Sequence, residues 1–172
     1  MRIPRSMFTT MSLVPFVSIA IGCGGGTFAD ISGSVEGVKL NATSFYHGGP
    51  FLVFTSRESE CLDMAWVERG SKFSSGEEPP TDYDMVSLLF TYANDEVVAE
   101  NVSVDGQSLV DARLIVVSGG AMTVYDTAGG FIDVTEIDKK DHVIGNFDLS
   151  FDNGSLQGDF EVEYCNNLKA DR

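Results

Sequence analysis

The chain has 172 residues, of which 26 are acidic and 11 are Lys or Arg, so its formal net charge at pH 7 is −15. The phosphates of nucleic acids and anionic lipid surfaces repel a protein of this charge, which argues against both as binding partners. The acidic residues are scattered rather than collected in runs, and this distribution predicts a solvated surface rather than an acidic tail.

The first 22 residues have the organisation of a secretory signal peptide. Arg2 and Arg5 form a short basic opening, and an apolar stretch follows from Met11 to Ile21. A stretch of this length matches the hydrophobic region of a signal peptide and is too short to span a bilayer as a helix. We therefore predict that the chain is exported and that residues 1–22 are removed.

The predicted leader ends in Ala20-Ile21-Gly22-Cys23, which resembles the lipobox of bacterial lipoproteins. The resemblance implies cleavage before Cys23, attachment of lipid (palmitate included) to that cysteine, and anchoring to the cell envelope. Because Gly24 rather than Asp follows the cysteine, it also implies the outer membrane rather than the inner one. The Gly-rich segment 24–27 would then be a flexible tether. The alternative is an ordinary secreted thiol, with cleavage downstream, for instance after Ala29.

The predicted organisation is a signal peptide (1–22), a lipidated cysteine with its tether (23–31), one β domain (32–165) and a C-terminal tail (166–172). Removal of the leader leaves 150 residues, enough for one sizeable core. It also makes the formal charge −17, because 9 basic residues then face 26 acidic ones. No second segment approaches the roughly 20 apolar residues of a membrane helix.

The body of the chain has the pattern of β-strands. Short apolar and β-branched runs are separated by Gly, Asn, Asp and Pro, and nothing supplies the alternating helices of a parallel α/β sheet. We predict an all-β fold, an antiparallel sandwich or flattened barrel of about eight or nine strands with one short helix. The predicted strands are Ser32–Tyr46 with a bend near Asn41, Phe51–Thr55, Met85–Ala93, Asn101–Val104, Ala112–Ser118, Ala121–Asp126, Phe131–Ile137, Val143–Phe151 and Ser155–Tyr164.

The C-terminal hairpin gives the clearest pattern. Apolar and polar residues alternate along Gly145–Phe151 and again along Ser155–Tyr164, which places one face of each strand in the core and the other in water. Asn153-Gly154 between them suits a tight turn. The pattern resembles the closing hairpin of uncharacterised all-β bacterial envelope lipoproteins, and this resemblance implies a fold and no activity.

One helix is predicted, over Ser56–Arg69. Thr55 and Glu58 have the spacing of a capping box, an apolar stripe that includes Cys61 follows, and Gly70 suits the C-terminal cap. Cys61 then lies in the first turn of this helix.

The chain has three cysteines. With Cys23 capped by lipid, Cys61 and Cys165 remain, and in an oxidising compartment we expect them to form a disulfide that staples the helix to the last strand. Cys165 has the parity of the polar outer face, so either the strand ends at Tyr164 or something covers that end of the face. The alternative is a pair of buried free thiols.

No residue pattern predicts catalysis. The chain lacks a G-x-S-x-G elbow and a C-x-x-C pair, and it lacks the EF-hand pattern for calcium. His47 precedes Gly48-Gly49-Pro50, which predicts an exposed turn, and His142 follows a charged turn. We therefore assign no catalytic residue, no metal ligand and no cofactor.

For function we expect a membrane-anchored envelope lipoprotein that is a non-enzymatic binding or assembly module, with an unknown envelope protein or glycan as its partner. One alternative is a carrier that holds a small apolar ligand in a β-barrel cavity lined by some of the 12 Phe and 5 Tyr residues. A second alternative is a hydrolase of envelope glycan or peptide, which would need clustered carboxylates, or His47 and His142, in one cleft.

Overall fold

The computed structural model describes residues 27–58, 84–94, 96–105, 108–138 and 142–165. All ten elements in these residues are β-strands, which confirms the predicted all-β class. The strands are β1 (Phe28–Val35), β2 (Ser44–Gly48), β3 (Phe51–Thr55), β4 (Met85–Tyr92), β5 (Asn101–Ser103), β6 (Val110–Ser118), β7 (Ala121–Asp126), β8 (Gly129–Ile137), β9 (His142–Phe151) and β10 (Gly154–Tyr164).

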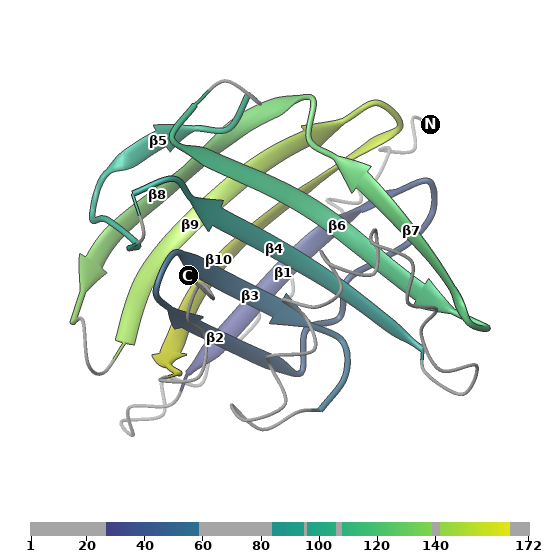
Figure 1. Ribbon diagram of the computed structural model, residues 1–172, viewed down its shortest axis with the longest axis horizontal. Helices are drawn as coiled ribbons and strands as arrows, with labels where there is room; N and C mark the ends of the chain where they lie inside the picture. The colour runs from purple at the N-terminus through teal and green to yellow at the C-terminus, as the bar shows by residue number, and fades with distance from the viewer. Residues whose placement is uncertain (1–26, 59–83, 95, 106–107, 139–141, 166–172) are drawn as a thin grey trace, which may run out of the picture.

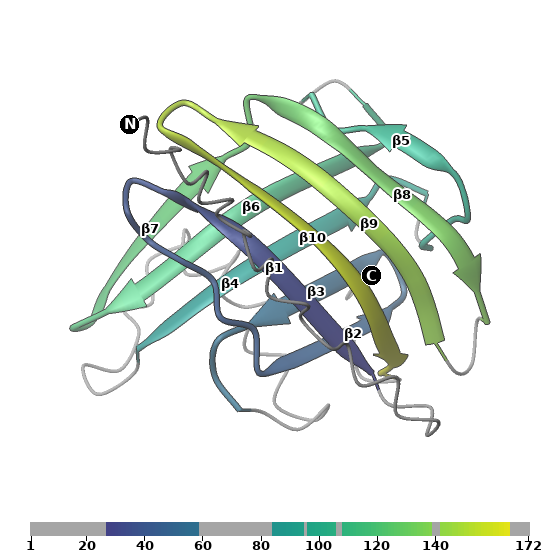
Figure 2. The ribbon, with the colours of Figure 1, turned by 180° about the vertical axis from the view of Figure 1, so that it is seen from behind.

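The strands form one curled sheet in the order β5-β8-β9-β10-β2-β3-β4-β6-β7, with β1 beside β10. The sheet folds over itself into a half-barrel with two layers (Figures 1 and 2). One layer contains β5, β8, β9, β10 and β1, and the other contains β2, β3, β4, β6 and β7. The main core lies between the layers and takes side chains from both.

A short parallel junction connects the layers. Strand β10 pairs with β9 along one edge, whereas its other edge is shared between β1 and β2. Only Glu163 and Tyr164 pair with β2, and they do so in parallel. The N–H of Cys165 then donates to the carbonyl oxygen of His47 at 2.7 Å. The prediction of a purely antiparallel sheet is therefore wrong at this pair, because alternation along a strand reports its faces and not the direction of its neighbour.

Glu36, in the turn after β1, forms a second contact between the layers. Its carboxylate accepts hydrogen bonds from Asn153 Nδ2 (3.1 Å), in the β9–β10 turn, and from the hydroxyl of Tyr125 (3.3 Å), in β7. Its backbone has a φ of 50°, which non-glycine residues rarely adopt.

Strand β1 differs from the predicted first strand at both ends. It begins at Phe28, earlier than the predicted Ser32, and it ends at Val35, before the predicted bend near Asn41.

Four phenylalanine rings fill the centre of the main core. Phe54, Phe90, Phe147 and Phe160 contact one another, with ring centroids 5.3 to 6.4 Å apart. The inward orientation of Phe147, Phe151 and Phe160 confirms what their alternation predicted. These rings therefore fill the space between the two layers by packing against each other, so that space is not an open ligand cavity.

Two glycines in the C-terminal hairpin make room for these rings. Gly145 lies opposite Phe160, and Gly158 lies opposite Phe147. A Cβ atom on Gly145 would lie 2.8 Å from Cζ of Phe160 and 2.3 Å from the carbonyl oxygen of Asp133. On Gly158 it would lie 3.2 Å from Cζ of Phe147. Each ring thus packs over a position without a side chain, which is a known use of glycine in curved sheets.

A second, smaller core lies on the other face of β3, β4 and β6. It contains Val53, Leu89, Ile115 and Cys165, so these strands are buried on both faces. The predicted helix Ser56–Arg69 is not seen: residues 56–58 are not helical, and the rest of it lies outside the described residues. The described part of the chain contains no helix long and apolar enough to cross a membrane.

We predict that Gly145→Ala destabilises the domain by about 1–3 kcal/mol, because the added methyl group must displace backbone or the Phe160 ring. Urea unfolding measures the change. Gly129→Ala is the matched control, since a Cβ there meets nothing closer than 3.6 Å, and we expect it to change stability by about 0.5 kcal/mol or less. Equal stability of the two variants would contradict the proposed role of Gly145.

Candidate functional site

A hollow of about 360 Å³ lies on the outer face of β1, β8, β9 and β10. These four strands are adjacent in the layer shown in front in Figure 2. Most of its side chains occupy the strand positions that alternate with the buried core residues, so they point away from the phenylalanine cluster. The lining consists of Asp30, Ser32, Phe131, Asn146, Phe147, Asp148, Gln157, Gly158 and Asp159.

The strand register arranges these side chains in two rows that cross the four strands. The first row is Ser32, Gln157, Asp148 and Phe131. The second row is Asp30, Asp159 and Asn146, and it continues on β8 to Asp133, which does not line the hollow. Neighbouring strands lie about 4.8 Å apart, so each row extends over roughly 14 Å of the sheet surface. The site is therefore a rigid platform built from strands, not from loops.

Hydrogen-bonding groups of two kinds alternate in the centre of the hollow. Gln157 lies opposite Asp148, and in the next row Asp159 lies opposite Asn146. A side-chain amide donates and accepts hydrogen bonds, whereas an ionised carboxylate only accepts them. Phe131 ends the first row with 37% of its surface exposed. The hollow thus offers donors, acceptors and an aromatic ring on one surface.

The charge of this face is one-sided. The four strands contain no Lys or Arg, and their seven carboxylates are Asp30, Asp133, Glu136, Asp148, Asp159, Glu161 and Glu163. Asp30 lies directly opposite Asp159, an arrangement that destabilises a strand pair. The stability of the sheet therefore does not explain why these carboxylates are here.

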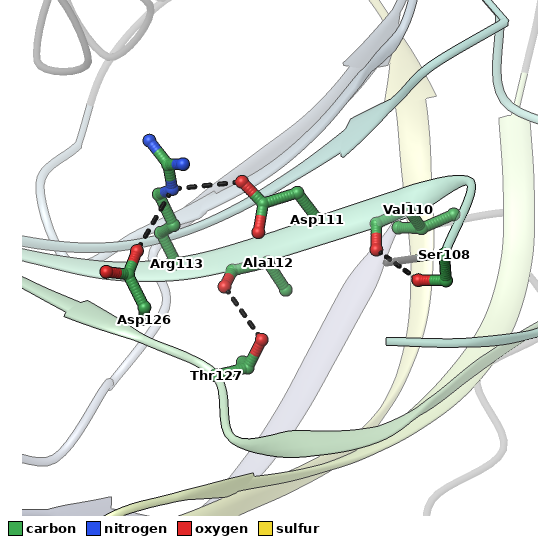
Figure 3. A network of polar contacts seen from close by, with 7 residues as sticks. All are labelled: Ser108, Val110, Asp111, Ala112, Arg113, Asp126 and Thr127. Atoms are coloured by element: carbon green, nitrogen blue, oxygen red, sulfur yellow. Dashed lines mark hydrogen bonds and ion pairs between the residues drawn. The ribbon is translucent and has the colours of Figure 1, made fainter. Parts of the chain in front are cut away.

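Arg113, the only Lys or Arg in the ten described strands, lies elsewhere, on β6. Its Nε atom is 2.9 Å from Oδ2 of Asp111 and 3.2 Å from Oδ1 of Asp126 (Figure 3). Nearby, the hydroxyl of Thr127 donates to the carbonyl oxygen of Ala112 at 3.1 Å. The contacts of Asp126 and Thr127 link the end of β7 to β6, whereas Asp111 and Arg113 are both on β6. The exposed ion pairs contribute little stability.

His47 does not lie in an exposed turn, so that prediction is wrong. It belongs to β2, opposite Tyr164 in the parallel junction, and only 3% of its surface is exposed. Gly49 and Pro50 do form a turn, but His47 and Gly48 still belong to β2. The His47 ring lies 5.3 Å from that of Tyr164, and its Nε2 atom has no hydrogen-bond partner among the residues that the structure describes. Burial, and to a lesser degree the charge of His142, lower the pKa of His47 to about 4.

The other predicted site residues are also outside the hollow. His142 opens β9, half-buried, with Nε2 3.6 Å from Oε1 of Glu136. Cys165 is fully buried in the second core, just after β10 ends at Tyr164, which is one of the two outcomes expected from its parity. Cys23 and Cys61 lie outside the described residues, so the Cys61–Cys165 disulfide stays a prediction. Among the described residues, no group of three or more His, Cys, Asp or Glu could hold a metal ion.

Sequence reasoning identified the outward positions of β9 and β10 as a polar face but did not identify the hollow. The contributions of Asp30 from β1 and of Phe131 from β8 depend on strand neighbours that the local pattern does not specify. The sequence feature that could have indicated the hollow is the alternation of amide and carboxylate residues in the C-terminal hairpin.

The chain matches no protein-family model, no curated protein and no solved structure. Function therefore has to be argued from the site itself.

We predict that His47 makes the domain less stable in mild acid. The unfolded chain binds a proton near the ordinary pKa of 6.5, whereas the folded chain does so only near 4. The free energy of unfolding should therefore fall as the pH falls from 6.5 to 4, by at most about 3 kcal/mol. Urea unfolding at several pH values measures this loss, and His47→Leu should reduce it while the control His142→Gln retains most of it. An unchanged pH dependence in His47→Leu would contradict the assignment.

Proposed function

We propose that the chain is an exported, lipid-anchored protein of the cell envelope that acts as a non-enzymatic binding module. The observation that carries the proposal is the outer-face hollow, in which hydrogen-bonding side chains from β1, β9 and β10 and the Phe131 ring from β8 lie together on an open surface. Groups held on strands are positioned more rigidly than groups on loops, which reduces the entropy lost on binding.

The residues of the hollow lack a nucleophile paired with a histidine, but their three carboxylates (Asp30, Asp148 and Asp159) meet one requirement of the hydrolase alternative. None of its side chains is a histidine or a cysteine, and its one hydroxyl, on Ser32, has no histidine beside it in the lining. The half-barrel interior, which a carrier of apolar ligands would use, is occupied by the phenylalanine cluster. The outer face is the surface that these observations leave for a ligand.

The N-terminal sequence supports a membrane anchor close to the domain. Residues 24–27 are all that separates Cys23 of the lipobox-like motif from Phe28, the first residue of β1. Five residue steps reach at most about 18 Å. Lipid on Cys23 would thus hold the domain at the membrane surface, while its charge keeps it from spreading on anionic lipid.

The anchor is tested by Cys23→Ser. We expect wild-type protein to incorporate labelled palmitate and to start at Cys23 by mass spectrometry, and we expect the variant to incorporate no label and to remain uncut before residue 23. Cys61→Ser is the matched control and should be labelled normally. A wild-type protein that is unlabelled, or that starts at another residue, would show that the chain is not a lipoprotein.

The binding role is tested with the mature chain carrying Cys23→Ser, sedimented with envelopes from the source organism. We expect Asn146→Ala combined with Gln157→Ala to weaken this association at least tenfold, because both amides are lost from the centre of the hollow without a change in charge. The control combines Ser118→Ala and Thr123→Ala, two exposed positions on β6 and β7. Equal association of the two double variants would rule out the hollow as the binding surface.

A further inference from the structure

The combination of groups in the hollow specifies the class of its ligand. Asn146 and Gln157 each lie opposite a carboxylate, so an amide and a carboxylate face each other in both rows across β9 and β10. A sugar hydroxyl both donates and accepts hydrogen bonds, and neighbouring hydroxyls on one ring can contact both polar atoms of a planar carboxylate or amide. This pairing therefore matches a ligand rich in adjacent hydroxyl groups.

The exposed aromatic ring supports the same class. Phe131 lies at the end of the row that contains Asp148, on the outward face of β8. One face of a pyranose ring consists of C–H groups, which pack against an aromatic side chain while the hydroxyls at the ring edge remain available for hydrogen bonds. A row of polar side chains that ends in an aromatic ring fits a chain of a few sugar units.

The negative charge of the hollow restricts the class of ligand further. An anionic glycan would be repelled by the carboxylates of β1, β8, β9 and β10, since these strands carry no Lys or Arg. A purely cationic ligand would match the carboxylates but would leave the amide donors of Asn146 and Gln157 without acceptors. An uncharged ligand with both donors and acceptors can bond to the carboxylates and to the amides of the hollow.

We propose that the hollow binds an uncharged oligosaccharide, with Asn146, Asp148, Gln157 and Asp159 bonding its hydroxyls and Phe131 packing on a ring face. This inference rests on the proposed binding function and names its ligand class. An open surface of this kind suits a segment within a longer glycan, because the chain can enter and leave along the rows.

The test is calorimetric titration of the mature chain carrying Cys23→Ser with tetrasaccharides. The uncharged probes are cellotetraose, maltotetraose and tetra-N-acetylchitotetraose, the cationic probe is the fully deacetylated form of the last, and spermine is the sugar-free cation. We expect at least one uncharged tetrasaccharide to bind with a Kd of about 1 mM or tighter, and with little dependence on salt. Phe131→Ala and Asn146→Ala should each weaken that binding about tenfold or more.

Phe28→Ala is the matched control. Phe28 is an exposed ring on β1 that does not line the hollow, and we expect its loss to leave the affinity unchanged. Binding of only the cationic tetrasaccharide and spermine, lost as salt is added, would overturn the inference, and so would binding of no uncharged probe. Association with envelopes is measured separately. If it persists while no uncharged tetrasaccharide binds, the proposed ligand is wrong but the proposed binding function is not.

Discussion

Backbone pairing along β10 is the constraint on which the rest of the structure depends. This one strand pairs with β9 over ten positions, with β1 over eight and with β2 over two. The first two pairings set the register of the outer face, and the third joins the layers that enclose the core. A slip of one residue in either long pairing would turn the outward polar side chains into the interior, which the buried phenylalanine rings prohibit.

The core and the candidate site are therefore consequences of the same alternation. Gly145 and Gly158 face inward and admit the rings of Phe160 and Phe147, while their neighbours Asn146 and Gln157 face outward into the hollow. Packing of the rings in the core fixes the positions of the β9 and β10 backbones. The polar side chains on the outer face are therefore held at a fixed spacing. A binding surface arranged in this way needs little ordering when a ligand arrives.

The sequence predicted the parts of the fold that depend on local pattern. The C-terminal hairpin, with Phe147 and Phe160 inward, follows from strict alternation and an Asn-Gly turn. The parallel junction at Tyr164 and the burial of His47 could not be predicted, because they depend on which distant strands become neighbours. The same limit applied to the site, where Asp30 and Phe131 join the hairpin only through pairings with β1 and β8. The predicted helix rested on local spacing alone, and the residues of it that the structure describes, 56–58, are not helical.

The central position of β10 also affects the order in which the chain can fold. Strand β1 comes first in the chain, yet its partner β10 ends at residue 164, and the two-residue pairing of β2 with β10 also needs that last strand. The two layers cannot join until nearly the whole sequence is present, and contacts between such distant segments form slowly. A nascent chain would therefore lack its closing strand and stay incompletely folded until its last residues are present. For the export proposed above, that is the state that a narrow translocation pore requires.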